Sequence, residues 1–175
     1  MHKRYAAWLL CMTFAGLAGC SQSAAIQPAV PHHSQQQAAA ALPGLQAGES
    51  LPWRELTAID GKPVLLQNGQ RQLLIFFATW CADSQRAMRQ LMASALVSQP
   101  DLQIVGIGRE EDAAALTAFA RVYQLNFALV ADPDRALFRQ VAEKGIPQLV
   151  TVSPAGQVQQ VLLGEVPDAI SLLHW

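Results

Sequence analysis

The chain has 175 residues, of which 51% are hydrophobic and 14% are charged, and its formal net charge is -1 at pH 7. This length is enough for one globular domain with a leader and a linker. The near-neutral charge gives no basic surface, so we expect no nucleic-acid partner. Of the cysteines Cys11, Cys20 and Cys81, only the last lies beyond the leader described next. No intrachain disulfide framework is therefore expected.

The first 20 residues have the layout of a secretory signal. Two basic residues precede an apolar run over residues 6–16, which is too short to cross a bilayer comfortably as a helix. The run closes with L-A-G-C at positions 17–20, which resembles a bacterial lipobox. The resemblance implies removal of residues 1–19 as a signal peptide and lipidation of Cys20, with palmitate as an expected acyl chain.

The residue after the lipidated cysteine is Ser21. By analogy with enteric lipoproteins, a serine at this position implies sorting to the outer membrane. We therefore expect a protein of the bacterial cell envelope that is held on a membrane by its lipid anchor, in the outer membrane and facing the periplasm.

Residues 20–48 carry the lipidated cysteine and then a segment rich in Ala, Gln, Pro and Ser, which is typical of a flexible linker. His32 and His33 are adjacent in it, but nothing nearby completes a set of metal ligands. We therefore expect no metal site and no cofactor. The globular domain is predicted to span residues 49–175.

The domain begins with a predicted hairpin over residues 51–66, in which Asp60-Gly61 forms the turn. A continuous apolar run over residues 73–77 then predicts a strand buried on both faces. Helix-start residues and helical spacing follow, which predicts a helix over about 83–98. Cys81 lies at the junction, where outward-pointing N–H groups and the positive end of the helix dipole favour the reactive thiolate.

The rest of the chain alternates between predicted strands and helices. The predicted elements are strand 102–108, helix 110–124, strand 127–130, a helix starting at positions 132–134, a strand after Pro147, strand 158–163 and a helix of at most two turns in 167–174. This alternation predicts an α/β sheet with crossover helices.

Two stretches resemble a known family. The sequence F-F-A-T-W-C-A-D-S at positions 76–84 is similar to the active-site segment of thioredoxin-like proteins of the membrane-tethered TlpA/ResA/CcmG type, whose usual form is F-W-A-T-W-C-x-x-C. The sequence G-I-P-Q-L-V-T-V at 145–152 is similar to a second block of that family. The resemblance covers residues 51–164 and implies a thioredoxin-like fold, with a central mixed sheet flanked by helices and an N-terminal hairpin.

The resemblance also implies roles for individual residues. Cys81 would be the catalytic nucleophile, and Pro147 would follow a cis peptide bond, face Cys81 and form the substrate edge with Ile146. The active-site motif would comprise Trp80, a partly exposed platform beside the thiol, with Ala82, Asp83 and Ser84.

Ser84 is the departure from the family pattern, because it stands where the second cysteine is found. A serine cannot release a mixed disulfide, so an adduct at Cys81 would persist until an outside thiol or a second substrate thiol resolves it. The Ser84 hydroxyl is a candidate hydrogen-bond partner of the sulfur. Asp83 would disfavour the thiolate if its charge lies close to the sulfur, and Arg86 and Arg89 are near enough along the helix to compensate, depending on the direction of their side chains. The sequence does not decide the sign of the net effect on the thiol pKa.

Other cysteine chemistries fit less well. The peroxiredoxin motif P-x-x-x-T-x-x-C would require proline and threonine where Leu74 and Ala78 stand. A Cys–His nucleophile pair would have to use His174, close to the C-terminus, and the same shortage of ligands argues against copper or zinc delivery. A site like that of glutathione peroxidase lacks recognisable asparagine and glutamine partners.

Two hypotheses remain open. The first is monothiol thiol–disulfide exchange, isomerase-like or reductase-like, with envelope proteins that carry thiols or disulfides, or with a small thiol. The second is a redox-inactive thioredoxin-fold module that binds an envelope protein. In either case we expect a monomer.

Overall fold

The fold is built around one central strand, β3 (Arg71–Phe77), whose residues after the first are all buried. The computed structural model describes residues 44–66, 68–142, 145–164 and 166–175. In it, a sheet of 5 strands runs in the order β5-β4-β3-β6-β7, so β3 lies in the middle. It pairs with β4 in parallel and with β6 antiparallel, and the predicted mixed sheet is therefore confirmed.

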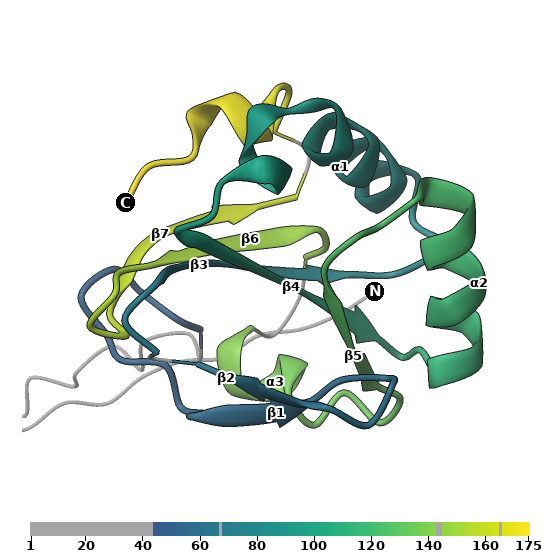
Figure 1. The fold of residues 1–175 in the computed structure, drawn as a ribbon, viewed down its shortest axis with the longest axis horizontal. Coiled ribbons are helices and arrows are strands. Elements are labelled where there is room, and N and C mark those ends of the chain that lie inside the picture. Colours follow the sequence, from purple (N-terminus) through teal and green to yellow (C-terminus); the bar gives the residue numbers. More distant parts are fainter. Residues whose placement is uncertain (1–43, 67, 143–144, 165) are drawn as a thin grey trace, which may run out of the picture. The chain divides into compact units, whose positions relative to one another are not determined.

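Most of the predicted strands and helices are present (Figure 1). The remaining strands are β1 (Glu55–Thr57), β2 (Pro63–Leu65), β4 (Leu102–Arg109), β5 (Ala128–Asp132), β6 (Gln148–Val152) and β7 (Val158–Leu163). The helices are α1 (Ala82–Ala93), α2 (Ala113–Tyr123) and the single-turn α3 (Phe138–Val141), with 3₁₀ helices η1 (Ala95–Ser98) and η2 (Ala169–Leu172). The predicted hairpin is confirmed as the antiparallel pair β1–β2.

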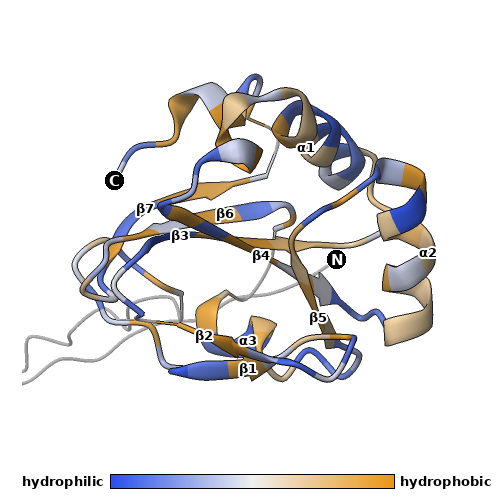
Figure 2. Ribbon diagram, in the orientation of Figure 1, coloured by the Kyte–Doolittle hydropathy of each residue, from blue (hydrophilic) through white to orange (hydrophobic). Residues whose placement is uncertain are grey.

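Apolar residues cover both faces of the sheet, as the continuous run in β3 predicts. One core lies between the sheet and α1, α2 and η2, and the other lies between the sheet, the β1–β2 hairpin and α3. Figure 2 shows hydrophobic residues along the middle of the sheet and on α3, and a mixture on α1 and α2, as expected of amphipathic helices. The sheet is thus a fixed platform for the loops at its ends.

The first helix is shorter than the predicted helix 83–98. It ends at Ala93, because Ser94 has an extended backbone and its hydroxyl donates to Leu91 O at 2.7 Å and accepts from Leu96 N–H at 3.3 Å. Serine side chains that bond the local backbone in this way compete with the helical pattern. The chain continues as η1 instead.

The helix predicted to start at positions 132–134 begins later, at Phe138. Asp132 belongs to β5, where it pairs with Arg109, and its two carboxylate oxygens accept from the N–H groups of Leu137 and Phe138 at 2.9 Å each. Arg135 has a left-handed backbone with φ of 63°. These constraints form a turn and delay the helix.

Residues 45–48, which the sequence places in the linker, contact the domain. Leu45 N–H donates to Val141 O at 2.9 Å, and Gly48 N–H donates to Val158 O at 2.8 Å. The leader, Cys20 and the histidine pair at 32–33 lie outside the described residues. Among the residues that are described, none forms a helix long and apolar enough to cross a membrane.

Candidate active site

Cys81 occupies the turn between β3 and α1, at the C-terminal edge of the parallel strands. It is the N-cap residue of α1, is half-buried and carries a free thiol. Its Sγ lies 3.9 Å from the carbonyl oxygen of Ile146. The thiol therefore faces the loop that leads into β6, and it makes no cap hydrogen bond to the N–H groups that begin α1.

That second loop contains the Ile146–Pro147 peptide bond, which is cis. Pro147 is buried, and its carbonyl oxygen accepts from Gly164 N–H at 2.7 Å at the end of β7. Residues 65 positions apart in the sequence, Cys81 and Ile146, are thus brought together by the pairing of β3 with β6.

The side chains on either side of the thiol are open to solvent. Trp80 is 64% exposed and Ala82 is also exposed. The Trp80 indole therefore lies mostly outside the core, and its role as a platform beside the thiol stays a prediction.

Ser84 has a different partner from the expected one. Its side chain is 0% exposed, and its Oγ accepts from Ala78 N–H at 3.3 Å. No hydrogen bond joins Ser84 Oγ to Cys81 Sγ in the described part of the chain. The hydroxyl therefore stabilises the backbone of the turn before the cysteine, and it leaves the sulfur without a second reactive group on α1.

The charges on α1 are largely paired away from the thiol. Arg86 Nη1 lies 2.7 Å from Asp83 Oδ1, an i,i+3 ion pair that offsets the charge of Asp83. Arg89 instead points to α2, where it donates to the Tyr123 hydroxyl at 3.3 Å. Of the two arginines, Arg86 is therefore the one that pairs with Asp83, and the side chain of Arg89 is directed to α2.

Glu111 belongs to the site and was missed by the sequence analysis. It lies between β4 and α2, is 6% exposed, and its Oε1 accepts from Thr79 N–H at 2.8 Å and from Thr79 Oγ1–H at 2.6 Å. No sequence signal points to this contact, because acidic residues at 110–112 fit the start of a helix and Thr79 is 32 positions away.

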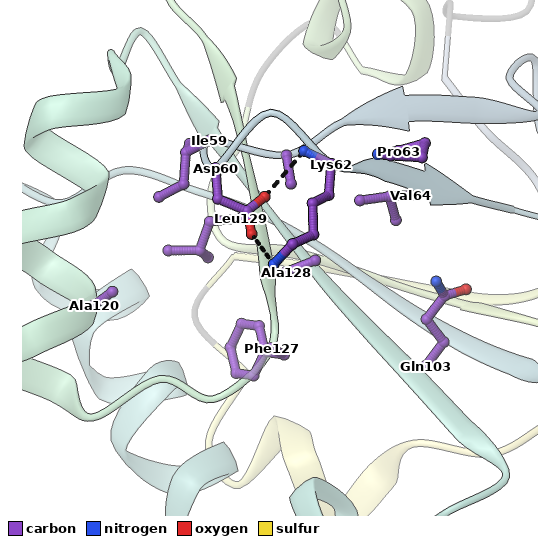
Figure 3. Close-up of a pocket in the computed structure, with 11 residues that line it drawn as sticks. Ile59, Asp60, Lys62, Pro63, Val64, Gln103, Ala120, Phe127, Ala128 and Leu129 are labelled. Carbon is purple, nitrogen blue, oxygen red and sulfur yellow. Dashed lines mark hydrogen bonds and ion pairs between the residues drawn. The ribbon is translucent and has the colours of Figure 1, made fainter.

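A hollow of about 420 Å³ lies at the other end of the sheet, between the β1–β2 turn and the start of β5 (Figure 3). Lys62 donates two hydrogen bonds to Asp60 beside it, which hold the pKa of Asp60 below its usual 3.8, while Asp60 raises the pKa of Lys62 above 10.5. Cys81 is not among the residues that line the hollow, so the hollow is separate from the thiol. Within the described ranges, no three His, Cys, Asp or Glu residues gather as a metal site would require.

The sequence model of the AhpC/TSA family matches residues 47–161, which include both loops of this site. The chain belongs to the AhpC/TSA family. The matched residues overlap nearly all of the segment 51–164 that resembles the thioredoxin-like family. Membership places the protein among the redoxins.

One relative with a similar sequence is a thiol–disulfide oxidoreductase. The thiol-disulfide oxidoreductase ResA of Bacillus subtilis is 25% identical over 134 residues, which are 74% of this chain and 73% of ResA.

Solved structures confirm the thioredoxin-like fold. A candidate protein disulfide isomerase from Bacteroides thetaiotaomicron has a TM-score of 0.67 and 24% identity, covering 75% of this chain and 88% of that one. A secreted Mycobacterium tuberculosis disulfide oxidoreductase homologous to Escherichia coli DsbE has a TM-score of 0.58 and 23% identity, covering 67% of this chain and 90% of that one.

Proposed function

We propose that the protein catalyses thiol–disulfide exchange through the single thiol of Cys81, as an isomerase-like or reductase-like protein tethered in the cell envelope. Two features observed together carry the proposal. Cys81 has a half-buried free thiol at the start of α1, and Ser84 is buried with its hydroxyl bonded to Ala78. A reactive cysteine is present, and its usual local partner is replaced by a structural hydroxyl.

The reaction follows from this arrangement. The Cys81 thiolate attacks one sulfur of a substrate disulfide, a Cys81–substrate disulfide forms, and the other substrate sulfur leaves as a thiolate that takes up a proton. Ser84 cannot displace the bound sulfur. If a second thiol of the same substrate attacks the substrate sulfur of the mixed disulfide, a new substrate disulfide forms, Cys81 leaves as the thiolate and the substrate is isomerised. If a small thiol attacks Cys81 Sγ instead, the substrate leaves as a dithiol, and a second small thiol then releases Cys81; the substrate is reduced, two small thiols end as their disulfide, and no cofactor is needed.

The substrates we propose are envelope proteins with thiols or disulfides, or a small thiol. Ile146 and Pro147 would form the edge against which a substrate chain lies, since the Ile146 carbonyl is already next to Sγ. The tether would be a lipid on Cys20 in the outer membrane. The L-A-G-C motif at 17–20 and Ser21 support that location, and they support it from the sequence alone.

The test is capture of mixed disulfides from envelope extract by the full-length chain, read on non-reducing gels. We expect discrete adducts with the native chain that vanish in reducing buffer, and none with Cys81→Ala. Adducts that survive in Cys81→Ala would contradict the proposal.

The same extract distinguishes the exchange reaction from the binding-module hypothesis. If a partner is retained equally by the native chain and by Cys81→Ala, and no adduct forms with either, the protein is a redox-inactive binding module and the exchange reaction is wrong. If retention depends on Cys81 and is reversed by a reductant, the exchange reaction stands.

A further inference from the structure

Glu111 is an acidic side chain that is almost fully buried, at 6% exposure. The chain reaches it through Glu110, whose left-handed backbone has φ of 61°, and Glu111 N–H donates back to Gly108 O at 3.3 Å. Acidic residues are rarely buried to this extent without a partner, because removing a carboxylate from water costs free energy. The groups that hydrogen-bond to the Glu111 carboxylate therefore indicate its structural role.

Among the described residues, both hydrogen bonds that the Glu111 carboxylate accepts come from Thr79. The Thr79 N–H and the Thr79 hydroxyl donate to the same carboxylate oxygen, at 2.8 and 2.6 Å. Hydrogen bonds to a carboxylate are shorter and stronger than those between neutral groups. Thr79 is held at both its backbone and its side chain, two positions before Cys81.

Among the described residues, the other side-chain bonds to the backbone of this turn come from α1, and the turn also has a bond within itself. Ser84 Oγ accepts from Ala78 N–H, Gln85 Nε2 donates to Thr79 O at 2.7 Å, and Cys81 N–H donates to Ala78 O at 3.2 Å. Among the described residues, Glu111 is the side chain from outside residues 78–85 that hydrogen-bonds to the backbone of residues 78–81. Its carboxylate thereby ties this turn to the β4–α2 loop.

We infer that Glu111 is a positioning residue for Cys81: through Thr79, its carboxylate fixes the turn that presents the thiol. The inference deepens the proposed thiol–disulfide exchange and rests on it for its biological meaning. Its physical content concerns the reactivity of Cys81 toward any disulfide, so it is tested with a small reagent. A displacement of about 1 Å at a reacting group can cost up to about a hundredfold in rate.

The experiment measures the reaction of the full-length chain with neutral 4,4′-dithiodipyridine at one pH. Cys81 attacks the reagent, a mixed disulfide forms, and the released thiopyridone is followed by its absorbance; the Cys81→Ala chain gives the background. The informative pair is Glu111→Ala and Glu111→Gln. Both lose the negative charge, but glutamine keeps an oxygen that accepts from Thr79.

We expect Glu111→Ala to react about tenfold more slowly than the native chain, and Glu111→Gln to recover most of that loss. Asp112→Ala is the matched control. It removes the N-cap bond that Asp112 Oδ1 accepts from Ala115 N–H in the same loop, which lowers stability without touching Thr79, so its rate should stay at the native value.

Equal rates for Glu111→Ala and Glu111→Gln would overturn the inference, as would an equal slowing by Asp112→Ala. If Glu111→Ala does not fold, Thr79→Val removes one of the two bonds and should slow the reaction about threefold; a native rate in Thr79→Val would then overturn it. A slowed Glu111→Ala in a protein that captures no envelope adducts would support the positioning role while contradicting the proposed function.

Discussion

At the scale of single residues, Ser84 supplies α1 with a buried hydroxyl, and not a thiol, three positions after Cys81. Ser84 stands where the resembled family has its second cysteine, and its Oγ accepts from Ala78 N–H. A buried N–H left without a partner costs about 1–3 kcal/mol. Ser84 therefore stabilises the turn, while Cys81 is left without a local resolving thiol.

Ser84→Cys should convert the site to a two-cysteine site. The introduced thiolate would attack the mixed disulfide at Cys81, a disulfide between Cys81 and the introduced sulfur would form, and the captured partner would leave as a thiol. We expect the adducts on non-reducing gels to fall to background, and the oxidised variant to be lighter by two hydrogens in mass spectrometry.

Ser84→Ala is the control for this change. It should keep the adducts, because the native hydroxyl bonds to Ala78 N–H and not to the sulfur, but it should lower the free energy of unfolding by about 1–3 kcal/mol. An undiminished adduct level in Ser84→Cys would contradict the role assigned to this position.

The sequence predicted the parts of the site that depend on neighbouring residues. Cys81 at the start of α1 follows from the apolar run and the helix-start residues around it, and the cis bond before Pro147 follows from a contiguous motif. Glu111 could not be predicted in the same way, since its contact with Thr79 depends on how β3 and β4 pair and on the left-handed backbone of Glu110.

At the scale of elements, the hairpin β1–β2 turns through Asp60 and Gly61, whose φ of 82° suits glycine. Asp60 accepts from Lys62 N–H at 3.1 Å and from Lys62 Nζ at 2.8 Å. Both side chains are largely exposed, so the ion pair adds little to stability. Because the ion pair shifts the pKa values of both side chains, it stabilises the fold over a defined pH window.

The window follows from the direction of each shift. The hydrogen bonds from Lys62 lower the pKa of folded Asp60, so the stabilisation is present above 3.8 and is lost as the pH falls through the lowered value. The pKa of folded Lys62 is raised, so the stabilisation is present below 10.5 and is lost as the pH rises through the raised value.

Lys62→Met should therefore raise the pKa of Asp60 toward 3.8, measured by NMR titration of its carboxylate carbon. The variant should be slightly less stable to urea than the native chain at neutral pH, and equally stable once Asp60 is protonated in both. Lys62→Arg is the control, because it keeps the charge. A stability difference that persists at low pH would show that the side chain acts through packing and not through the pair.

Helix boundaries were predicted less well than strands. Continuous apolar runs identified β3 and β4, whereas α1 already ends at Ala93 and α3 begins only at Phe138. Both differences come from side chains that bond the local backbone, Ser94 to Leu91 O and Asp132 to two N–H groups of the following turn. Residue spacing alone does not reveal such bonds.

At the scale of the whole molecule, one sheet separates two cores and places the thiol at its C-terminal edge, while the Asp60–Lys62 turn and the adjacent hollow lie at the other end. The helices of the described residues pack against the sheet, and none of them is long and apolar enough to span a bilayer. The attachment to a membrane that we propose uses a lipid on Cys20.

Cys20→Ala in the full-length chain should move the protein from the membrane fraction to the soluble periplasmic fraction, because one acylated residue supplies the proposed attachment. Cys11→Ala changes a cysteine inside the leader and should leave the protein with the membranes. Immunoblots of fractionated cells distinguish the two variants. Retention of Cys20→Ala in the membrane fraction would show that another feature attaches the chain.

Trp80 gives the protein an optical property that the other indoles of the domain lack. Trp53 and Trp175 are half-buried, whereas Trp80 is 64% exposed and adjoins the thiol in sequence. Its emission should be the most red-shifted of the three, and excitation at the long-wavelength edge of the absorption band should select it. Occupation of the site by a partner is then visible as a blue shift in unlabelled protein, before any covalent bond has formed.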